Sequence, residues 1–109
     1  IRLIAVGYNH IFAWHPHGFH GLVIGTDGRK LSYPYEKDTL LIGSGERYDI
    51  LYKIPDSSSM RGCSSCNYGP GISIAHDHNM MGMVSQGMYP HGPQTIFDVR
   101  SKSTKPVNE

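Results

Sequence analysis

Short apolar runs, each ended by a turn residue, recur along the chain and predict β-strands. Alternation is clearest in residues 47–54, where one face of a strand would carry Tyr48, Ile50, Tyr52 and Ile54. Asp27-Gly28 is a strong signal for a two-residue hairpin turn after one such run. No window of about 11 residues or more has the apolar period of an amphipathic helix, so we expect little helix. The expected strands cover residues 2–6, 22–26, 38–42, 47–54, 71–75 and 95–99.

The spacing of these strands predicts a single all-β domain. Short strands separated by turns at intervals of roughly 8–12 residues are typical of β-sandwiches and barrels. The 109 residues include 13 Gly and 7 Pro, a composition that favours many turns. We expect the domain to span residues 1–99, with an irregular loop at 55–70 and a loose tail at 100–109.

Charge and hydropathy exclude several classes of partner. A formal net charge of +1 provides no broad basic field for nucleic acid. No apolar run approaches the ~20 residues that a membrane-spanning helix requires. The first residues do not have the pattern of a secretory signal peptide.

Two His-x-His pairs are the main chemical signal, His15-Pro16-His17 and His76-Asp77-His78. Residues i and i+2 of a strand point to the same face, so each pair can place two imidazoles side by side. Neutral imidazole binds copper, zinc, iron or nickel, and the spacing does not choose among them. Because Pro16 cannot donate a ladder hydrogen bond, we expect the first pair at a strand edge or bulge. All four histidines are candidate metal ligands.

The order of the motifs resembles a cupredoxin domain of the multicopper oxidases, a family that includes laccases and relatives of copper nitrite reductase. The resemblance spans about residues 1–99 and rests on the segments 2–8 (RLIAVGY), 15–20 (HPHGFH), 23–28 (VIGTDG), 38–41 (DTLL), 45–49 (GERYD), 76–78 (HDH) and 87–93 (GMYPHGP). It implies a cupredoxin-like Greek-key β-sandwich or barrel. Family domains begin with strands before the segment that residues 2–6 resemble, so we expect a partial domain without its first strands. Exposed strand edges would then favour a homo-oligomer.

The resemblance also implies a function. In the family, His-x-His pairs from two domains together hold a trinuclear copper cluster that reduces dioxygen to water. By position, His15, His17, His76 and His78 would be copper ligands, and a further copy of the chain or a second cupredoxin domain would complete the site. An extracellular or periplasmic location follows from the same resemblance.

Two positions depart from the family pattern. The family's blue-copper cysteine is replaced by Asp77, and a carboxylate cannot supply a copper–thiolate bond. The family's further histidine is replaced by Gly82, and His10 has no counterpart at the usual spacing. We therefore expect no blue copper in this chain and no appreciable oxidase turnover from the chain alone.

Other functions and roles stay open at this stage. The chain could be a non-catalytic copper- or zinc-binding module, or a structural cupredoxin domain with unused histidines. Asp77 could orient an imidazole or manage protons, or it could face solvent. Cys63 and Cys66 could form a disulfide, stay as thiols or bind metal. The methionines at 80, 81, 83 and 88 could offer thioethers or fill gaps, and Glu46-Arg47-Tyr48-Asp49 is expected to be a structural hairpin.

Overall fold

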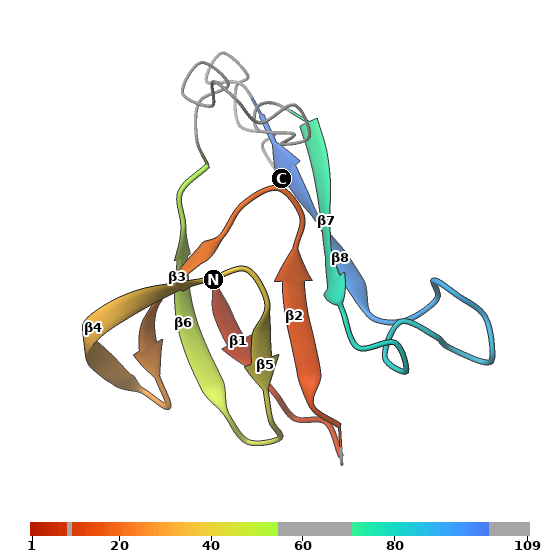
Figure 1. Cartoon of the computed structure of the whole chain (residues 1–109), viewed down its shortest axis with the longest axis horizontal. Coiled ribbons are helices and arrows are strands. Elements are labelled where there is room, and N and C mark those ends of the chain that lie inside the picture. Colours follow the sequence, from red (N-terminus) through yellow and green to blue (C-terminus); the bar gives the residue numbers. More distant parts are fainter. Residues whose placement is uncertain (9, 55–70, 101–109) are drawn as a thin grey trace, which may run out of the picture.

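The computed structural model describes residues 1–8, 10–54 and 71–100, which form two four-stranded antiparallel sheets (Figure 1). Along the first sheet, the strands are β1 (Arg2–Ile4), β6 (Arg47–Tyr52), β3 (Gly21–Thr26) and β4 (Arg29–Lys37). Along the second, they are β5 (Leu40–Ile42), β2 (Phe12–Pro16), β7 (Gly71–Asp77) and β8 (Gln94–Val99). This part of the chain contains no helix, which confirms the all-β prediction, and so no helix in it could cross a membrane.

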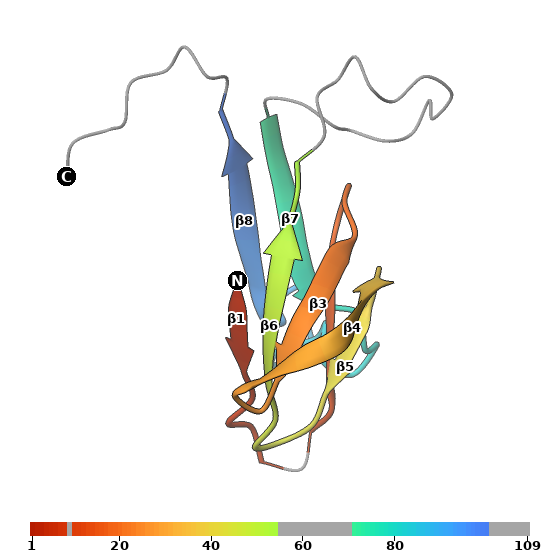
Figure 2. The ribbon, with the colours of Figure 1, turned by 90° about the vertical axis from the view of Figure 1, so that its left-hand side faces the viewer.

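The core lies between the two sheets, with β6 and β3 in front of β7 in Figure 2. The alternation predicted in residues 47–54 is confirmed up to the end of β6, because Ile50 is buried and Tyr48 and Tyr52 pack against the same cluster. The second sheet contributes Trp14, whose indole Nε1 donates a hydrogen bond of 2.8 Å to the Tyr52 hydroxyl. The buried members of the cluster are Trp14, Val23, Leu40, Ile50 and Ala75.

The hairpin between β3 and β4 has the predicted two-residue turn. Thr26 pairs with Arg29, and the residues between them, Asp27 and Gly28, have φ values of +50° and +81°. Positive φ at both positions is the requirement of a type I′ turn, which Asp-Gly meets at low cost.

Two strands were not predicted, β4 and β2. β4 is an edge strand whose residues are nearly all exposed, so it has no apolar alternation.

The prediction that the first histidine pair lies at a strand edge or bulge is wrong. The pair belongs to β2, and β2 lies between β5 and β7. Pro16 is tolerated at the end of β2 because His17 N–H donates to Ile74 O on the β7 side. The Pro16 nitrogen then faces the β5 side, where pairing has already ended at Trp14–Leu40.

The segment Glu46-Arg47-Tyr48-Asp49 is structural, but it does not form a hairpin. It follows a tight turn that carries the chain from β5 in the second sheet to β6 in the first. Glu46 Oε2 accepts a hydrogen bond of 2.7 Å from Gly43 N within this turn, and Asp49 pairs with Arg2 of β1. The predicted loop at 55–70, with Cys63 and Cys66, and the tail from 101 onward lie outside the described residues.

Truncation of Ile50 tests the assignment of the core face. Ile50 is 3% exposed and its chain neighbour Leu51 is 57% exposed. Ile50→Ala should lower the free energy of unfolding by about 2–5 kcal/mol, since it removes buried methyl groups and leaves a cavity. Leu51→Ala, the matched control, should change it by about 0.5 kcal/mol or less. Equal losses in denaturant unfolding would contradict the face assignment.

Candidate metal centre

The register of β2 against β7 brings the two His-x-His pairs together. His15 lies directly opposite His76 in this antiparallel pair, between the Trp14–Asp77 and Pro16–Ala75 pairs. Inward-facing Trp14 and Ala75 are buried in the core, so the histidines alternate onto the outer face of the second sheet. The i, i+2 reasoning therefore placed each pair correctly on one face. We call His15, His17, His76 and His78 the histidine cluster.

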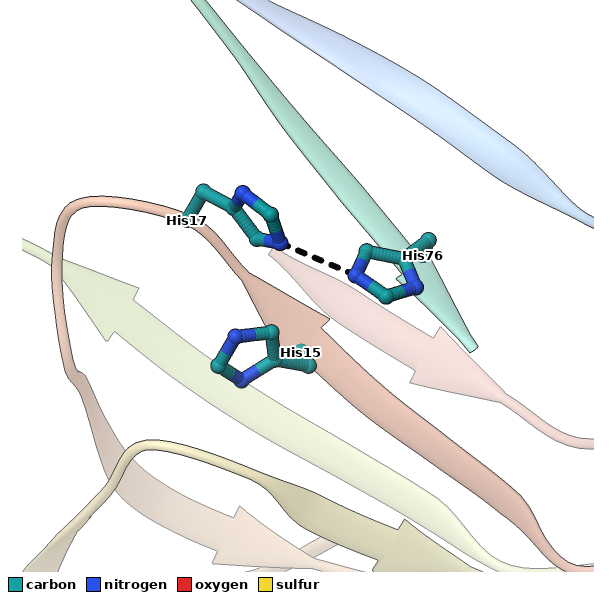
Figure 3. Close-up of side chains that lie close together, drawn as sticks. All are labelled: His15, His17 and His76. Atoms are coloured by element: carbon teal, nitrogen blue, oxygen red, sulfur yellow. Dashed lines mark hydrogen bonds between the residues drawn. The ribbon is translucent and has the colours of Figure 1, made fainter. Parts of the chain in front are cut away.

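The imidazoles of the cluster lie close together, and Figure 3 shows three of them. Ring centroids lie 5.1 Å apart for His15–His17, 5.7 Å for His15–His76 and 4.9 Å for His17–His76. These three residues offer one ring nitrogen each within 4.8 Å of one another. The His78 ring lies 4.7 Å from that of His15 and 5.4 Å from that of His76. A single ion could therefore be held by the first three, with His78 beside them.

Hydrogen bonding orients the ring nitrogens toward one another. His76 Nδ1 lies 2.9 Å from Asp77 O. A carbonyl oxygen only accepts, so Nδ1 carries the proton and Nε2 of neutral His76 has a free lone pair. That Nε2 lies 2.9 Å from His17 Nε2. Two nitrogens bound to one metal at about 2.0–2.1 Å in tetrahedral geometry would be roughly 3.3 Å apart, so a metal could replace the proton between them with a small shift.

The environment favours neutral imidazoles. Burial lowers the pKa of His15 most, and the neighbouring His78, His17 and His76 lower it further, against the opposing effect of Asp38. Burial likewise lowers the pKa of His17, with help from His76 and His78. The neutral form is the one that binds a metal.

Apolar residues surround the histidine cluster on the outer face of the second sheet. Those that are exposed include Leu41, Ile72, Ile74 and Ile96. On one side, a hollow of 160 Å³ is lined by His17, His76 and Met83, among others. Of the methionines proposed as thioether donors, Met83 borders this hollow, while Met80 and Met81 are 74% and 83% exposed.

Asp77 points away from the histidine cluster, into the protein. It is 1% exposed, so the alternative that it faces solvent is wrong. Its Oδ1 accepts hydrogen bonds from Ala13 N and Asn79 N, and its Oδ2 lies 2.6 Å from His10 Nε2. Burial raises the pKa of Asp77, but the hydrogen bonds from His10, Asn79 and Ala13 outweigh it, so the net pKa is lowered. The carboxylate is held ionised, and His10 is its partner.

Gly82 is explained by the same carboxylate. A Cβ at this position would overlap Asp77 Oδ2 and come within 3.1 Å of His10 Nε2. The turn that follows β7 can therefore pass over the Asp77–His10 pair only if residue 82 has no side chain.

Sequence reasoning missed two contacts around the site. The Asp77–His10 pair joins residues 67 positions apart, and no local pattern indicates it. Thr39 Oγ1 lies 2.9 Å from His15 Nδ1, a contact that becomes visible only when the β2–β5 register is known.

Comparison with known proteins agrees with this architecture. The two-sheet arrangement is that of the cupredoxin-like domains of multicopper oxidases. A model of the multicopper oxidase family matches residues 1–81, and the chain belongs to that family. Membership implies copper as the metal, and nothing in the comparisons supports zinc. No match was found among curated protein sequences.

Three solved structures resemble the chain. The multicopper oxidase mgLAC is 33% identical with a TM-score of 0.71, and the match covers 100% of this chain and 29% of that one. The blue copper oxidase from Nitrosomonas europaea is 32% identical with a TM-score of 0.68, covering 90% and 26%. The laccase from Botrytis aclada is 24% identical with a TM-score of 0.62, covering 99% and 17%, and supports the fold alone. The chain thus spans less than a third of each.

Removal of the Asp77 carboxylate tests its structural role. Asp77→Ala should lower the free energy of unfolding by about 3 kcal/mol or more, since it leaves Ala13 N–H and His10 without their acceptor. Asp98→Ala is the matched control, because Asp98 pairs with Arg100 at the surface and should contribute about 1 kcal/mol or less. Similar small losses for both variants would show that the buried pair is not needed for the fold.

Proposed function

We propose that this chain is a copper-binding domain of a multicopper oxidase that supplies half of an oxygen-reducing copper site. His15, His17, His76 and His78 would be its ligands. The observation that carries this proposal is that three ring nitrogens from β2 and β7 lie within 4.8 Å of one another on an outward-facing surface. Bound copper would supply the electron transfer by which dioxygen is reduced to water.

A second domain would complete the site. The histidine cluster lies on the outer face of its sheet, and the exposed apolar residues beside it offer area for a partner to cover. The partner we propose is another cupredoxin domain, either a further copy of this chain or a different domain. In this arrangement each partner contributes ligands to copper ions held between them. An extracellular or periplasmic location, as expected from the resemblance, would suit such an oxidase.

We propose that electrons enter the site from the partner. Asp77 occupies the position of the family's blue-copper cysteine, and its carboxylate is bound to His10, Ala13 and Asn79. Its part at the site is positional, because its backbone carbonyl accepts the proton of His76 Nδ1 while its side chain faces the interior. The chain alone would then bind copper without oxidising phenols.

A non-catalytic copper-binding module is the second candidate. The observation that favours it is that three ligands within one chain are enough to hold a single ion without a partner. The two candidates differ in whether the outer face of the second sheet is covered in the working protein.

Replacement of two ligands tests copper binding. The purified chain should retain copper after dialysis, without the intense visible absorption of a copper–thiolate bond. The double variant His76→Ala/His78→Ala should lose stoichiometric copper in metal analysis. His91→Ala is the control, because His91 is exposed and outside the cluster. Full copper retention by the double variant would refute the ligand assignment, and a thiolate band would refute the absence of a blue site.

Self-association tests the proposed interface. The chain should form an oligomer in light scattering. Ile96→Lys should raise the dissociation constant of that oligomer about tenfold, because it places a charge on the apolar outer face. Leu51→Lys is the matched control, since Leu51 is similarly exposed but lies on the first sheet. A chain that stays monomeric with and without copper would contradict association between copies and leave the separate domain as the partner.

A further inference from the structure

The corner between β4 and β5 contacts His15, a half-buried member of the histidine cluster. β4 ends at Lys37 in the first sheet and β5 begins at Leu40 in the second, so Asp38 and Thr39 carry the chain across. Thr39 Oγ1 lies 2.9 Å from His15 Nδ1. The His15 side chain is 17% exposed. The contact therefore joins a connecting segment to a proposed copper ligand.

The strand register explains why Thr39 and His15 meet. β2 and β5 pair as Phe12–Ile42, Ala13–Leu41 and Trp14–Leu40, and the next pair in this series is His15–Thr39. Directly opposed residues of an antiparallel pair lie on the same face with their Cβ atoms about 5 Å apart. Since Trp14 and Leu40 face the core, Thr39 faces outward with His15.

The hydrogen-bond donors and acceptors around His15 favour one arrangement of protons. The Thr39 hydroxyl donates to Asp38 Oδ2 at 3.2 Å, because an ionised carboxylate only accepts. With its proton committed to Asp38, the hydroxyl oxygen acts as the acceptor toward His15. Asp38 Oδ2 itself lies 3.4 Å from His15 Nδ1 and is also an acceptor. His15 Nδ1 therefore carries the proton, and the lone pair of neutral His15 is on Nε2.

We propose that Thr39, held by Asp38, is a positioning residue that fixes His15 in the metal-binding tautomer and orientation. This inference rests on the proposed function, because it assigns a role toward the same copper ligands. His76 has an equivalent arrangement, in which Asp77 O accepts the Nδ1 proton. The two opposed histidines thus have their Nδ1 protons bound by acceptors from different parts of the chain, the β4–β5 connection and the end of β7. Partners of this kind on the far nitrogen of a ligating histidine typically affect metal affinity 10–100-fold.

The test compares two substitutions that differ in one group. Thr39→Val keeps the branched shape and removes the hydroxyl, while Thr39→Ser keeps the hydroxyl. In copper titrations, Thr39→Val should weaken copper affinity about 10–100-fold, and Thr39→Ser should stay close to the parent protein. Asp38→Ala should also weaken copper affinity, because the freed hydroxyl can then turn and donate to His15 Nδ1. The loss should be smaller than for Thr39→Val, because the hydroxyl oxygen is still present to accept the Nδ1 proton. Equal affinity of the valine, serine and parent proteins would overturn the proposal.

A second measurement separates this proposal from the proposed function. Nitrogen NMR of the metal-free chain reports which ring nitrogen of His15 carries the proton. The parent protein and Thr39→Ser should show the Nδ1–H form, and Thr39→Val should shift the population toward Nε2–H. This shift without copper binding would support the positioning role and refute the copper site. An Nε2–H form in the parent protein would overturn the positioning role whatever the copper result. Denaturant unfolding of each variant identifies any that fails to fold. If Thr39→Val does not fold, Asp38→Ala is compared with the parent protein in its place.

Discussion

The pairing of β2 with β5 on one side and β7 on the other is the constraint on which the candidate site depends. This register sets His15 opposite His76, and its continuation sets His15 beside Thr39. Because strand side chains alternate between faces, a slip of one residue would turn the histidines into the core and Trp14 into solvent. The burial of Trp14 and Leu40 therefore holds the imidazoles in place as much as any contact among them.

Asp77 shows how one position can serve two faces of a strand. Its neighbours His76 and His78 point outward, and its own carboxylate points into the protein, where a charge is costly unless it is bonded. Hydrogen bonds from Ala13 N, Asn79 N and His10 meet that cost, and they also tie the start of β2 and the turn after β7 to one anchor. Its backbone carbonyl meanwhile orients His76. The hydrogen bonds of the Asp77 carboxylate thus lie on the inner side of the sheet beneath the histidine cluster, and only its backbone carbonyl contacts a cluster side chain.

Local patterns were enough to predict most of the fold and the candidate ligands, but not their surroundings. β6 was recognisable because Tyr48, Ile50 and Tyr52 occupy every second position, and each His-x-His pair implied a shared face. β4 was missed because an exposed edge strand needs no apolar period. The position of β2 was predicted wrongly because Pro16 was expected to exclude a central strand. Pro16 is accommodated because its nitrogen faces the β5 side, where the pairing has already ended. Contacts such as Asp77–His10 and Thr39–His15 depend on long-range register, which no local period encodes.

The supports of the histidine cluster indicate what kind of site it is. His15 and His76 each have Nδ1 beside a fixed acceptor, and the Nε2 atom of His76 faces that of His17. Imidazoles that served only as surface residues would gain nothing from such restraint, because water satisfies both ring nitrogens equally well. Restraint lowers the entropy lost when ligands converge on an ion. The arrangement therefore favours metal binding over incidental clustering. Its position on the outer face leaves room for further ligands from a second domain, which a closed structural site would not.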